Sequence, residues 1–419
     1  MKKTALFFII FLSLSINAQD VQKLYDSRDF IQISHLDIEK WQVADAPTPF
    51  LRAYVYSVMA RYEESNKEID SFLKTDNVKE DPRLMIRLLY MQAENFAKKF
   101  RYKETANIYK KIIDNYGDLV GEAIDAYQAQ YSRYNILSGI DPMQVSIPHN
   151  TKIQTRSDKK DLLLVQVRTP NDSVSLTIDT GAGMSIVTKS VAKRLGIRIL
   201  ADSAIVAGTG IANTISMSIG VADTLYLGDV LYENVVFGIM EDEYLTLPEL
   251  DYAINGSIGS PEIQALLSMK IHRNGIIEIF KNDDKIKSNM MLTEDNQTVV
   301  QVNDTLLFIL DTGAAWSNLS FNYYNKNKEQ IEKMGKFTTK TVGGAGGTKD
   351  FPIYKLTDFP IKINTNTTIL PEIPCFIQPS VVTWYEYDGG LGQDVISQYD
   401  YMLLDFKNMY FSFGNTKQL

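Results

Sequence analysis

Hydrophobic residues follow two different periods along this chain of 419 residues. Between about residues 20 and 140 they recur at helical spacing, as in Tyr102, Ala106, Tyr109 and Ile113. Beyond residue 154, valine, isoleucine, leucine and threonine alternate with polar residues in short runs that turn residues separate. The pattern therefore predicts a multidomain chain, in which an all-α N-terminal segment precedes an all-β region.

The helical segment carries an internal repeat. The stretch ARYEESNKEI (60–69) aligns with FRYKETANIY (100–109), and each predicts the start of the second helix of a pair. Asp81 followed by Pro82 predicts an N-cap and the first position of a helix. Residues 19–140 loosely resemble tetratricopeptide (TPR-like) helical repeats, although an irregular helical bundle fits the pattern equally well.

The N-terminus has the pattern of a secretory signal. Lys2 and Lys3 precede a short apolar run from Ala5 to Ile16, and Ala18 supplies a small residue for cleavage. The run is too short to span a bilayer comfortably, so it predicts a signal peptide over residues 1–18. No other long apolar run follows. We therefore expect a mature chain without a transmembrane segment, exported to the periplasm or secreted.

Composition narrows the chemistry that the chain could carry. The formal net charge is -8 and no long basic run is present, which argues against nucleic acid as a partner. Cys375 is the only cysteine, so no internal disulfide can form, and we expect it to be a small buried hydrophobe. The three histidines are scattered without metal-ligand spacing. We expect no metal, no cofactor and no Ser-His-Asp arrangement.

A duplication in the β-rich region is the main indication of function. The tripeptide Asp-Thr-Gly at 179–181 recurs at 311–313. Asn-Asp followed by a hydroxyl residue begins eight residues before each aspartate, at 171–173 and 303–305, and predicts a hairpin turn. Each aspartate is therefore expected to follow the second strand of a hairpin.

Matches farther along the chain extend the duplication. Glycine-rich stretches stand at 207–210 and 343–347, about thirty residues after their respective aspartates. The stretch NGSIGSPEI (255–263) is echoed by GGLGQDVI (389–396). Two independent matches at nearly the same offset make a pair of unrelated turns a poor explanation of the repeated tripeptide.

The extent of the repeat suggests how the chain divides. Two closing hairpins, at 269–280 and 402–413, align at almost the same offset as the two aspartates. We therefore expect one lobe over residues 155–285 and a second over 286–419. Two prolines within residues 141–154 predict a linker between the helical segment and the first lobe.

At these residues the chain resembles the aspartic protease superfamily, and its retropepsin-like branch more closely than its pepsin branch. The resemblance is carried by LTIDTGA, AGTG and SIG in the first copy, and by FILDTGA, GGAGG and GLG in the second. It covers roughly residues 150–415, and the pattern is similar to that of secreted bacterial aspartyl-protease-like proteins with predicted helical N-terminal extensions. It implies two fused lobes in a bilobal all-β fold, with a cleft between them.

The resemblance implies that Asp179 and Asp311 form a catalytic pair. Two adjacent carboxyls share one proton, a behaviour for which aspartic proteases are themselves the standard example. The charged acid activates a water, and the protonated acid polarises the scissile carbonyl. The residues implied to support the pair are Thr180, Gly181, Thr312 and Gly313.

The glycine-rich tips are implied to be mobile flaps that close over a bound peptide, although ordinary hairpin turns would have the same composition. The flap positions are Gly208, Thr209, Gly210, Gly344, Ala345 and Gly346.

The sequence thus predicts an aspartic endopeptidase that acts on a peptide or protein substrate. Two alternatives remain at this stage. One is a non-catalytic peptide-binding protein that keeps the protease fold. The other is a helical scaffold that recruits a protein partner through the N-terminal segment, with proteolysis serving locally.

Overall fold

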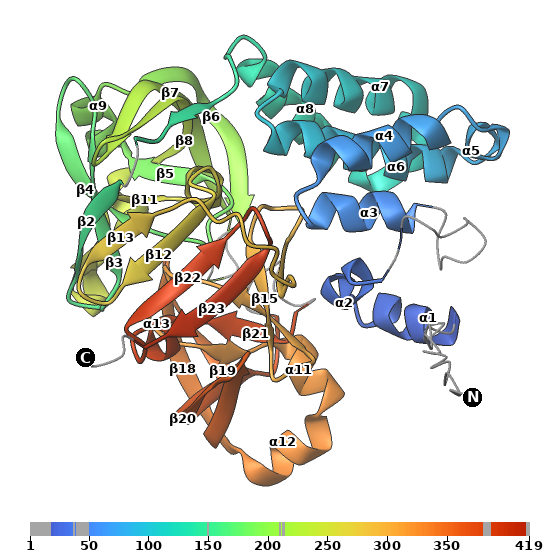
Figure 1. Cartoon of the computed structure of the whole chain (residues 1–419). Helices are drawn as coiled ribbons and strands as arrows, with labels where there is room; N and C mark the ends of the chain where they lie inside the picture. The colour runs from blue at the N-terminus through green and yellow to red at the C-terminus, as the bar shows by residue number, and fades with distance from the viewer. Residues whose placement is uncertain are drawn as a thin grey trace, which may run out of the picture.

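The computed structural model describes residues 18–36, 38, 50–148, 151–208, 211, 214–379 and 387–415. Its N-terminal part is helical and the remainder is rich in strands, as the sequence predicts. Figure 1 shows the helices gathered beside the strands. The predicted signal peptide lies outside the described residues except for its last residue, Ala18, with which the first helix begins.

The N-terminal helices are α1 (Ala18–Asp26), α2 (Phe30–Ser34), α3 (Leu51–Val58), α4 (Tyr62–Phe72), α5 (Asp76–Glu80), α6 (Pro82–Lys98), α7 (Tyr102–Val120), the 3-10 turn η3 (Gly121–Ala123) and α8 (Ile124–Leu137). Within the part of the chain that the structure describes, none of the helices is both long and apolar enough to cross a membrane.

The repeat in the helical segment appears in the contacts between helices. Ser65 Oγ in α4 donates a hydrogen bond to the carbonyl of Ala53 at 2.7 Å, and Thr105 Oγ1 in α7 donates to the carbonyl of Ala93 at 3.4 Å. The helix pairs α3/α4 and α6/α7 therefore share equivalent contacts.

The predicted N-cap is confirmed, because the Asp81 carboxylate accepts from two backbone amides in the first turn of α6.

One sheet has 13 strands. They are β1 (Gln144–Ser146), β2 (Lys152–Ser157), β3 (Leu163–Arg168), β4 (Ser173–Ile178), β5 (Ser185–Thr188), β6 (Arg198–Gly208), β7 (Thr214–Leu227), β8 (Val230–Met240), β11 (Gly256–Ile258), β12 (Ser268–His272), β13 (Ile276–Ile279), β22 (Tyr401–Asp405) and β23 (Tyr410–Gly414).

A second sheet has eight strands. They are β14 (Met290–Leu292), β15 (Thr298–Val302), β16 (Leu306–Leu310), β17 (Asn318–Leu319), β18 (Lys336–Gly344), β19 (Gly347–Ile363), β20 (Asn366–Phe376) and β21 (Gly389–Leu391). The smaller elements are α9 (Lys189–Leu195), η4 (Asp242–Leu245), the paired β9 (Thr246–Leu247) and β10 (Tyr252–Ala253), η5 (Pro248–Leu250), α10 (Ser260–Gln264), α11 (Phe321–Lys326), α12 (Lys328–Met334) and α13 (Gln393–Ile396).

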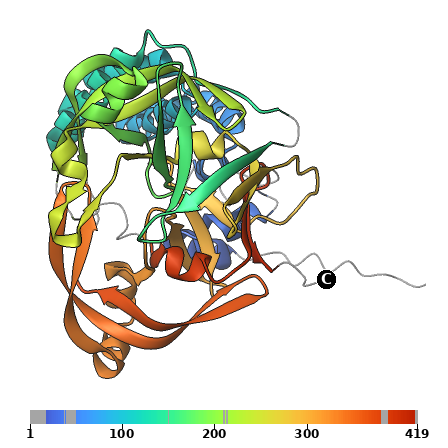
Figure 2. The same cartoon turned by 90° about the vertical axis from the view of Figure 1, so that its left-hand side faces the viewer.

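The two sheets repeat the same strand order, so the duplication is structural. The first runs β2-β3-β4-β11-β5-β8-β7-β6 and the second runs β14-β15-β16-β21-β17-β20-β19-β18. In both, the strand before the aspartate lies beside a short parallel strand that comes much later in the chain. In Figure 2 the long orange β18–β19 hairpin rises beside the yellow segment that follows β8.

Two features differ from the division that the sequence suggests. Strands β22 and β23 come from the end of the chain, yet β22 pairs with β12, so the closing hairpin of the second copy joins the sheet of the first. A free strand edge pairs with whichever edge the packing brings beside it, and sequence position does not restrict that choice. Residues 141–154, predicted to be a linker, contain β1, which pairs with β8.

The helices share apolar cores with both sheets. Phe30 and Ile31 of α2 belong to one buried cluster with Met291, Val299 and Ile309 of the second sheet. Farther along the chain, Tyr109 of α7 and Ala93 of α6 belong to another cluster with Ile219 of β7. Because burial of apolar surface is the main stabilising contribution, the helical region and the sheets support each other.

Candidate active site

Each aspartate of the repeated tripeptide directly follows a buried strand. Asp179 follows β4 and Asp311 follows β16. The backbone amide of Asp179 donates to the Ile258 carbonyl of β11 at 3.0 Å, and that of Asp311 donates to the Leu391 carbonyl of β21 at 2.9 Å. The parallel neighbour strand therefore holds each acid at the same point of its sheet.

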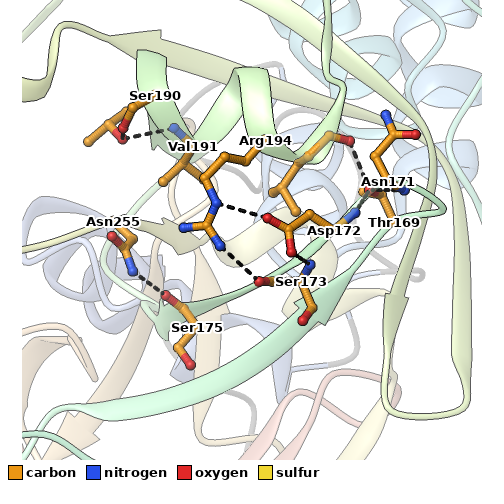
Figure 3. Close-up of polar contacts among 11 residues, drawn as sticks. Thr169, Asn171, Asp172, Ser173, Ser175, Ser190, Val191, Arg194 and Asn255 are labelled. Carbon is orange, nitrogen blue, oxygen red and sulfur yellow. Dashed lines mark hydrogen bonds and ion pairs between the residues drawn. The ribbon is translucent and has the colours of Figure 1, made fainter.

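The turns that precede these strands form as predicted. Residues 171–173 connect β3 to β4, and residues 303–305 connect β15 to β16. In the first hairpin, the Asp172 carboxylate accepts from the Ser173 amide at 2.7 Å and from Arg194 Nε at 2.8 Å (Figure 3). Arg194 belongs to α9, so this helix anchors the hairpin that leads to the first aspartate.

Two threonines form hydrogen bonds between the two copies. The Thr180 amide donates to Thr312 Oγ1 at 3.0 Å, and the Thr312 amide donates to Thr180 Oγ1 at 3.1 Å. Each hydroxyl also donates across the boundary, Thr180 to the Leu310 carbonyl and Thr312 to the Ile178 carbonyl, both at 2.7 Å. All four residues are buried. Four hydrogen bonds thus join two loops that are far apart in the sequence.

Each glycine of the tripeptide faces the opposite aspartate. A Cβ atom on Gly181 would lie 2.6 Å from Cγ of Asp311, and a Cβ atom on Gly313 would lie 2.6 Å from Cγ of Asp179. The Gly181 amide also donates to Asp179 Oδ1 at 3.0 Å, and the Gly313 amide donates to Asp311 Oδ1 at 2.9 Å. Each half-buried carboxyl therefore lies between the amide of its own loop and the glycine of the other.

The two carboxyls have similar surroundings and are electrostatically coupled. Desolvation raises the pKa of both, and the charge of Asp179 contributes to a pKa of Asp311 well above the usual range. Two backbone amides lower the pKa of each carboxyl, those of Gly181 and Ala182 for Asp179 and those of Gly313 and Ala314 for Asp311. The pair therefore holds one proton readily, and the two carboxyls share it.

A serine–carboxyl pair behind the first aspartate is a feature that the sequence prediction missed. Ser185 Oγ donates to the Glu262 carboxyl at 2.5 Å and accepts from the Gly259 amide at 2.8 Å. Glu262 is buried, and this burial raises its pKa to about 7. The serine thus ties the loop after Asp179 to the start of α10.

The second copy repeats this network with a shorter acid. Ser317 Oγ donates to Asp394 Oδ1 at 2.6 Å and accepts from the Gly392 amide at 2.9 Å. Both serines stand six residues after their aspartate, and both acids recur at the same offset as the aspartates. This shared offset is the signal in the sequence that identifies the pair as part of the site.

The predicted flap positions are only partly described. Gly208 ends β6, and Thr209 and Gly210 lie outside the described residues. The other predicted positions, at the turn between β18 and β19, are Gly344, Ala345 and Gly346. The Gly346 amide donates to the Tyr244 carbonyl of η4 at 2.8 Å, and Ala345 packs against an apolar cluster of the first sheet. The tip of the β18–β19 hairpin therefore contacts the first copy.

Other candidate chemistry is sparse in the described residues. Among them, no group of three or more histidine, cysteine, aspartate or glutamate side chains is arranged to hold a metal ion. Cys375 is buried in β20, as predicted, and burial raises the pKa of its thiol to about 12. A thiol with such a pKa is a poor nucleophile at neutral pH.

A comparison with models of protein families agrees with the resemblance read from the sequence. Residues 165–270, which include Asp179, match the family model of an aspartyl protease, so the predicted aspartic protease superfamily is confirmed for this region. Among solved structures, conglutin gamma, a basic 7S globulin from lupine seeds, is 11% identical over 64% of this chain and 96% of its own, with a TM-score of 0.38. A retropepsin-like aspartic protease from Rickettsia conorii is 14% identical over 32% of this chain and 92% of its own, with a TM-score of 0.22. No curated protein matches the sequence.

Proposed function

We propose that this chain, which carries an aspartic protease domain, is an aspartic-type endopeptidase that hydrolyses peptide bonds with a water activated between Asp179 and Asp311. The observation that carries the proposal is that Gly181 lies against the Asp311 carboxyl and Gly313 lies against the Asp179 carboxyl. This reciprocal contact brings together two acids from distant parts of the chain, which is the requirement of the reaction.

In the proposed reaction the two acids have different roles. The ionised member, written here as Asp179, removes a proton from the water, and the hydroxide adds to the carbonyl carbon of the peptide. Asp311 gives its proton to the carbonyl oxygen, which leaves a neutral tetrahedral intermediate. Asp179 then transfers its proton to the leaving nitrogen while the intermediate returns a proton to Asp311. The C–N bond breaks, and no covalent enzyme intermediate forms.

The proposal includes a bilobal arrangement, with a peptide cleft between the two copies and the hairpin tips acting as flaps. The matching strand orders of the two sheets support it. The helical region is proposed to be a short TPR-like stack, supported by the equivalent contacts that Ser65 and Thr105 make in successive helix pairs.

Export to the periplasm or secretion is also part of the proposal, and it rests on the sequence pattern of residues 1–18. N-terminal sequencing of protein recovered outside the cytoplasm tests it. A mature chain that begins at Gln19 is the expected result, and full-length protein confined to the cytoplasm would contradict it.

Substitution of the two acids tests the catalytic proposal. Asp179→Asn and Asp311→Asn remove the base or the acid but keep the size of the side chain. We expect each to lower kcat/KM on a mixture of unstructured peptides by at least about a thousandfold. Asp223→Asn is the matched control, because its exposed carboxylate pairs only with the exposed Arg198 at the surface.

The outcomes separate the candidate functions. Cleavage that survives in both purified variants would exclude the proposed pair. Peptide binding by the wild-type protein without any cleavage would instead indicate a non-catalytic peptide-binding protein with a protease fold.

A further inference from the structure

A lysine of the β18–β19 hairpin makes no ion pair with any described residue and contacts the loop that follows Asp311. Lys340 in β18 places its ammonium 4.4 Å from the centre of the Trp316 ring. Trp316 stands five residues after Asp311, and Lys340 stands four residues before Gly344, at the end of β18. The contact therefore joins strand β18, which leads to the hairpin tip, to the loop that follows Asp311.

The two acidic groups whose charges act on Lys340 already have partners. The Asp394 carboxylate accepts from the Ser317 amide at 2.9 Å and from the Ser317 hydroxyl at 2.6 Å. Glu372 pairs with Lys355 at 2.8 Å. Neither forms an ion pair with Lys340, and its ammonium lies over the face of the Trp316 indole.

The Lys340 ammonium has lost part of its hydration. The side chain is half-buried, and desolvation lowers its pKa in spite of the opposing charges of Asp394 and Glu372. A partly desolvated cation without an anion is energetically unfavourable, and a carboxylate that reached it would form a charge-assisted hydrogen bond. The indole adds an apolar wall, because Trp316 stacks on Phe376 at a ring separation of 6.2 Å.

The first copy is different at the equivalent place. The residue that corresponds to Trp316 is Met184, since each stands five residues after its aspartate. Met184 packs against an apolar cluster that includes Met217 and Met240, and Arg133 of α8 donates to its sulfur at 3.5 Å. At the equivalent place in the first copy the neighbouring cation therefore comes from the helical region, whereas Lys340 comes from the β18–β19 hairpin of its own copy.

We propose that Lys340 and Trp316 form a subsite that binds a carboxylate of the peptide, so that the preferred substrate carries an acidic group near the scissile bond. The inference rests on the proposed endopeptidase function. The carboxylate has two possible sources, an aspartate or glutamate side chain or the C-terminus of a short peptide.

A peptide series distinguishes these sources. Each position within three residues of the scissile bond carries either Glu or Gln, and each peptide is made with a free or an amidated C-terminus. If a side chain is the source, Glu at one position raises kcat/KM about tenfold over Gln in the wild type. If the C-terminus is the source, the free acid is favoured by a similar factor.

Variants of the lysine assign the preference to the subsite. Lys340→Met keeps the length of the side chain and should abolish the preference, and Lys340→Glu should reverse it, so that Gln is favoured over Glu or the amidated C-terminus over the free one. Lys349→Met is the matched control. Its side chain is exposed on the neighbouring strand β19, and its ammonium also lies over an aromatic ring, Phe351, at 5.3 Å.

The results separate this inference from the function on which it rests. The subsite proposal is overturned if peptides with and without the carboxylate, at the side chain and at the C-terminus, are cleaved at equal rates. It is also overturned if the preference survives in Lys340→Met. Either result leaves the proposed endopeptidase function intact. If the wild type cleaves no peptide, the proposed function fails, and the Kd of the same peptides for Asp179→Asn then tests the subsite alone. We expect Asp179→Asn to bind the peptide that carries the carboxylate about tenfold more tightly than the matched neutral peptide. Equal affinity for the two peptides, or no detectable binding, overturns the inference.

Discussion

The Thr180 hydroxyl is the most direct means to test how the two copies are held together. It donates to the Leu310 carbonyl and accepts from the Thr312 amide, and all three residues are buried. Thr180→Val keeps the shape of the side chain and removes only these bonds. Each buried group left without a partner costs about 1–3 kcal/mol, so we expect a loss of about 2–6 kcal/mol in the free energy of unfolding.

The same substitution should affect catalysis. The lost bonds belong to the loops that carry the two acids, so the carboxyls are expected to move apart slightly. A displacement of about 1 Å at reacting groups lowers the rate about a hundredfold, and we expect kcat/KM to fall by that order.

Urea unfolding and peptide hydrolysis of the same preparations measure both effects. Thr180→Ser restores the hydroxyl and should recover most of the stability and the activity. Thr246→Val is the control, because that exposed hydroxyl donates only to the local Asp242 carbonyl. If Thr180→Val costs less than about 1 kcal/mol and keeps full activity, or if Thr180→Ser shows the same defects, the threonine contacts do not hold the site together.

Three further substitutions test other parts of the structure. Gly181→Ala should abolish hydrolysis, because its Cβ would lie 2.6 Å from Cγ of Asp311; an active, folded variant in a kinetic assay would contradict the facing loops. Glu262 has its pKa raised from 4.5 to about 7, so its favourable effect on stability is complete below pH 4.5 and is lost as the pH rises through 7. The size of this loss is about 3 kcal/mol, and Glu262→Gln should remove that part of the pH dependence in unfolding curves; an unchanged profile would exclude Glu262 as its source. Ile31→Ala should destabilise the chain by about 2–5 kcal/mol, because the side chain is fully buried in a cluster shared with the second sheet; a loss below about 1 kcal/mol in urea unfolding would show that α2 contributes little.

Local features of the fold could be predicted from the sequence because they depend on neighbouring residues. The Asn-Asp turns at 171–173 and 303–305 connect strands as predicted, and Asp81 caps α6. Turn and cap residues act through hydrogen bonds within a few positions of the chain, so their signal is complete in a short window.

The partners of buried surfaces could not be predicted in the same way. The helical spacing indicates which faces are apolar, but it does not specify that Ile31 packs beside Met291 or Tyr109 beside Ile219. Apolar burial is non-directional, so many partners satisfy the same pattern. Which segments pack together likewise decides that β22 pairs with β12 and that the Lys340 ammonium lies over the Trp316 ring.

The sequence by itself determined that one structural unit occurs twice and that each unit ends a strand with Asp-Thr-Gly. A repeat at one offset implies two similar folds, whatever their mutual arrangement. Only the tertiary structure decided that Gly181 lies against Asp311, that Thr180 and Thr312 exchange hydrogen bonds, and that the helices pack on both sheets. Such contacts join residues that are distant along the chain. They form only when whole sheets and helices bury their apolar faces together, and no local pattern specifies that arrangement.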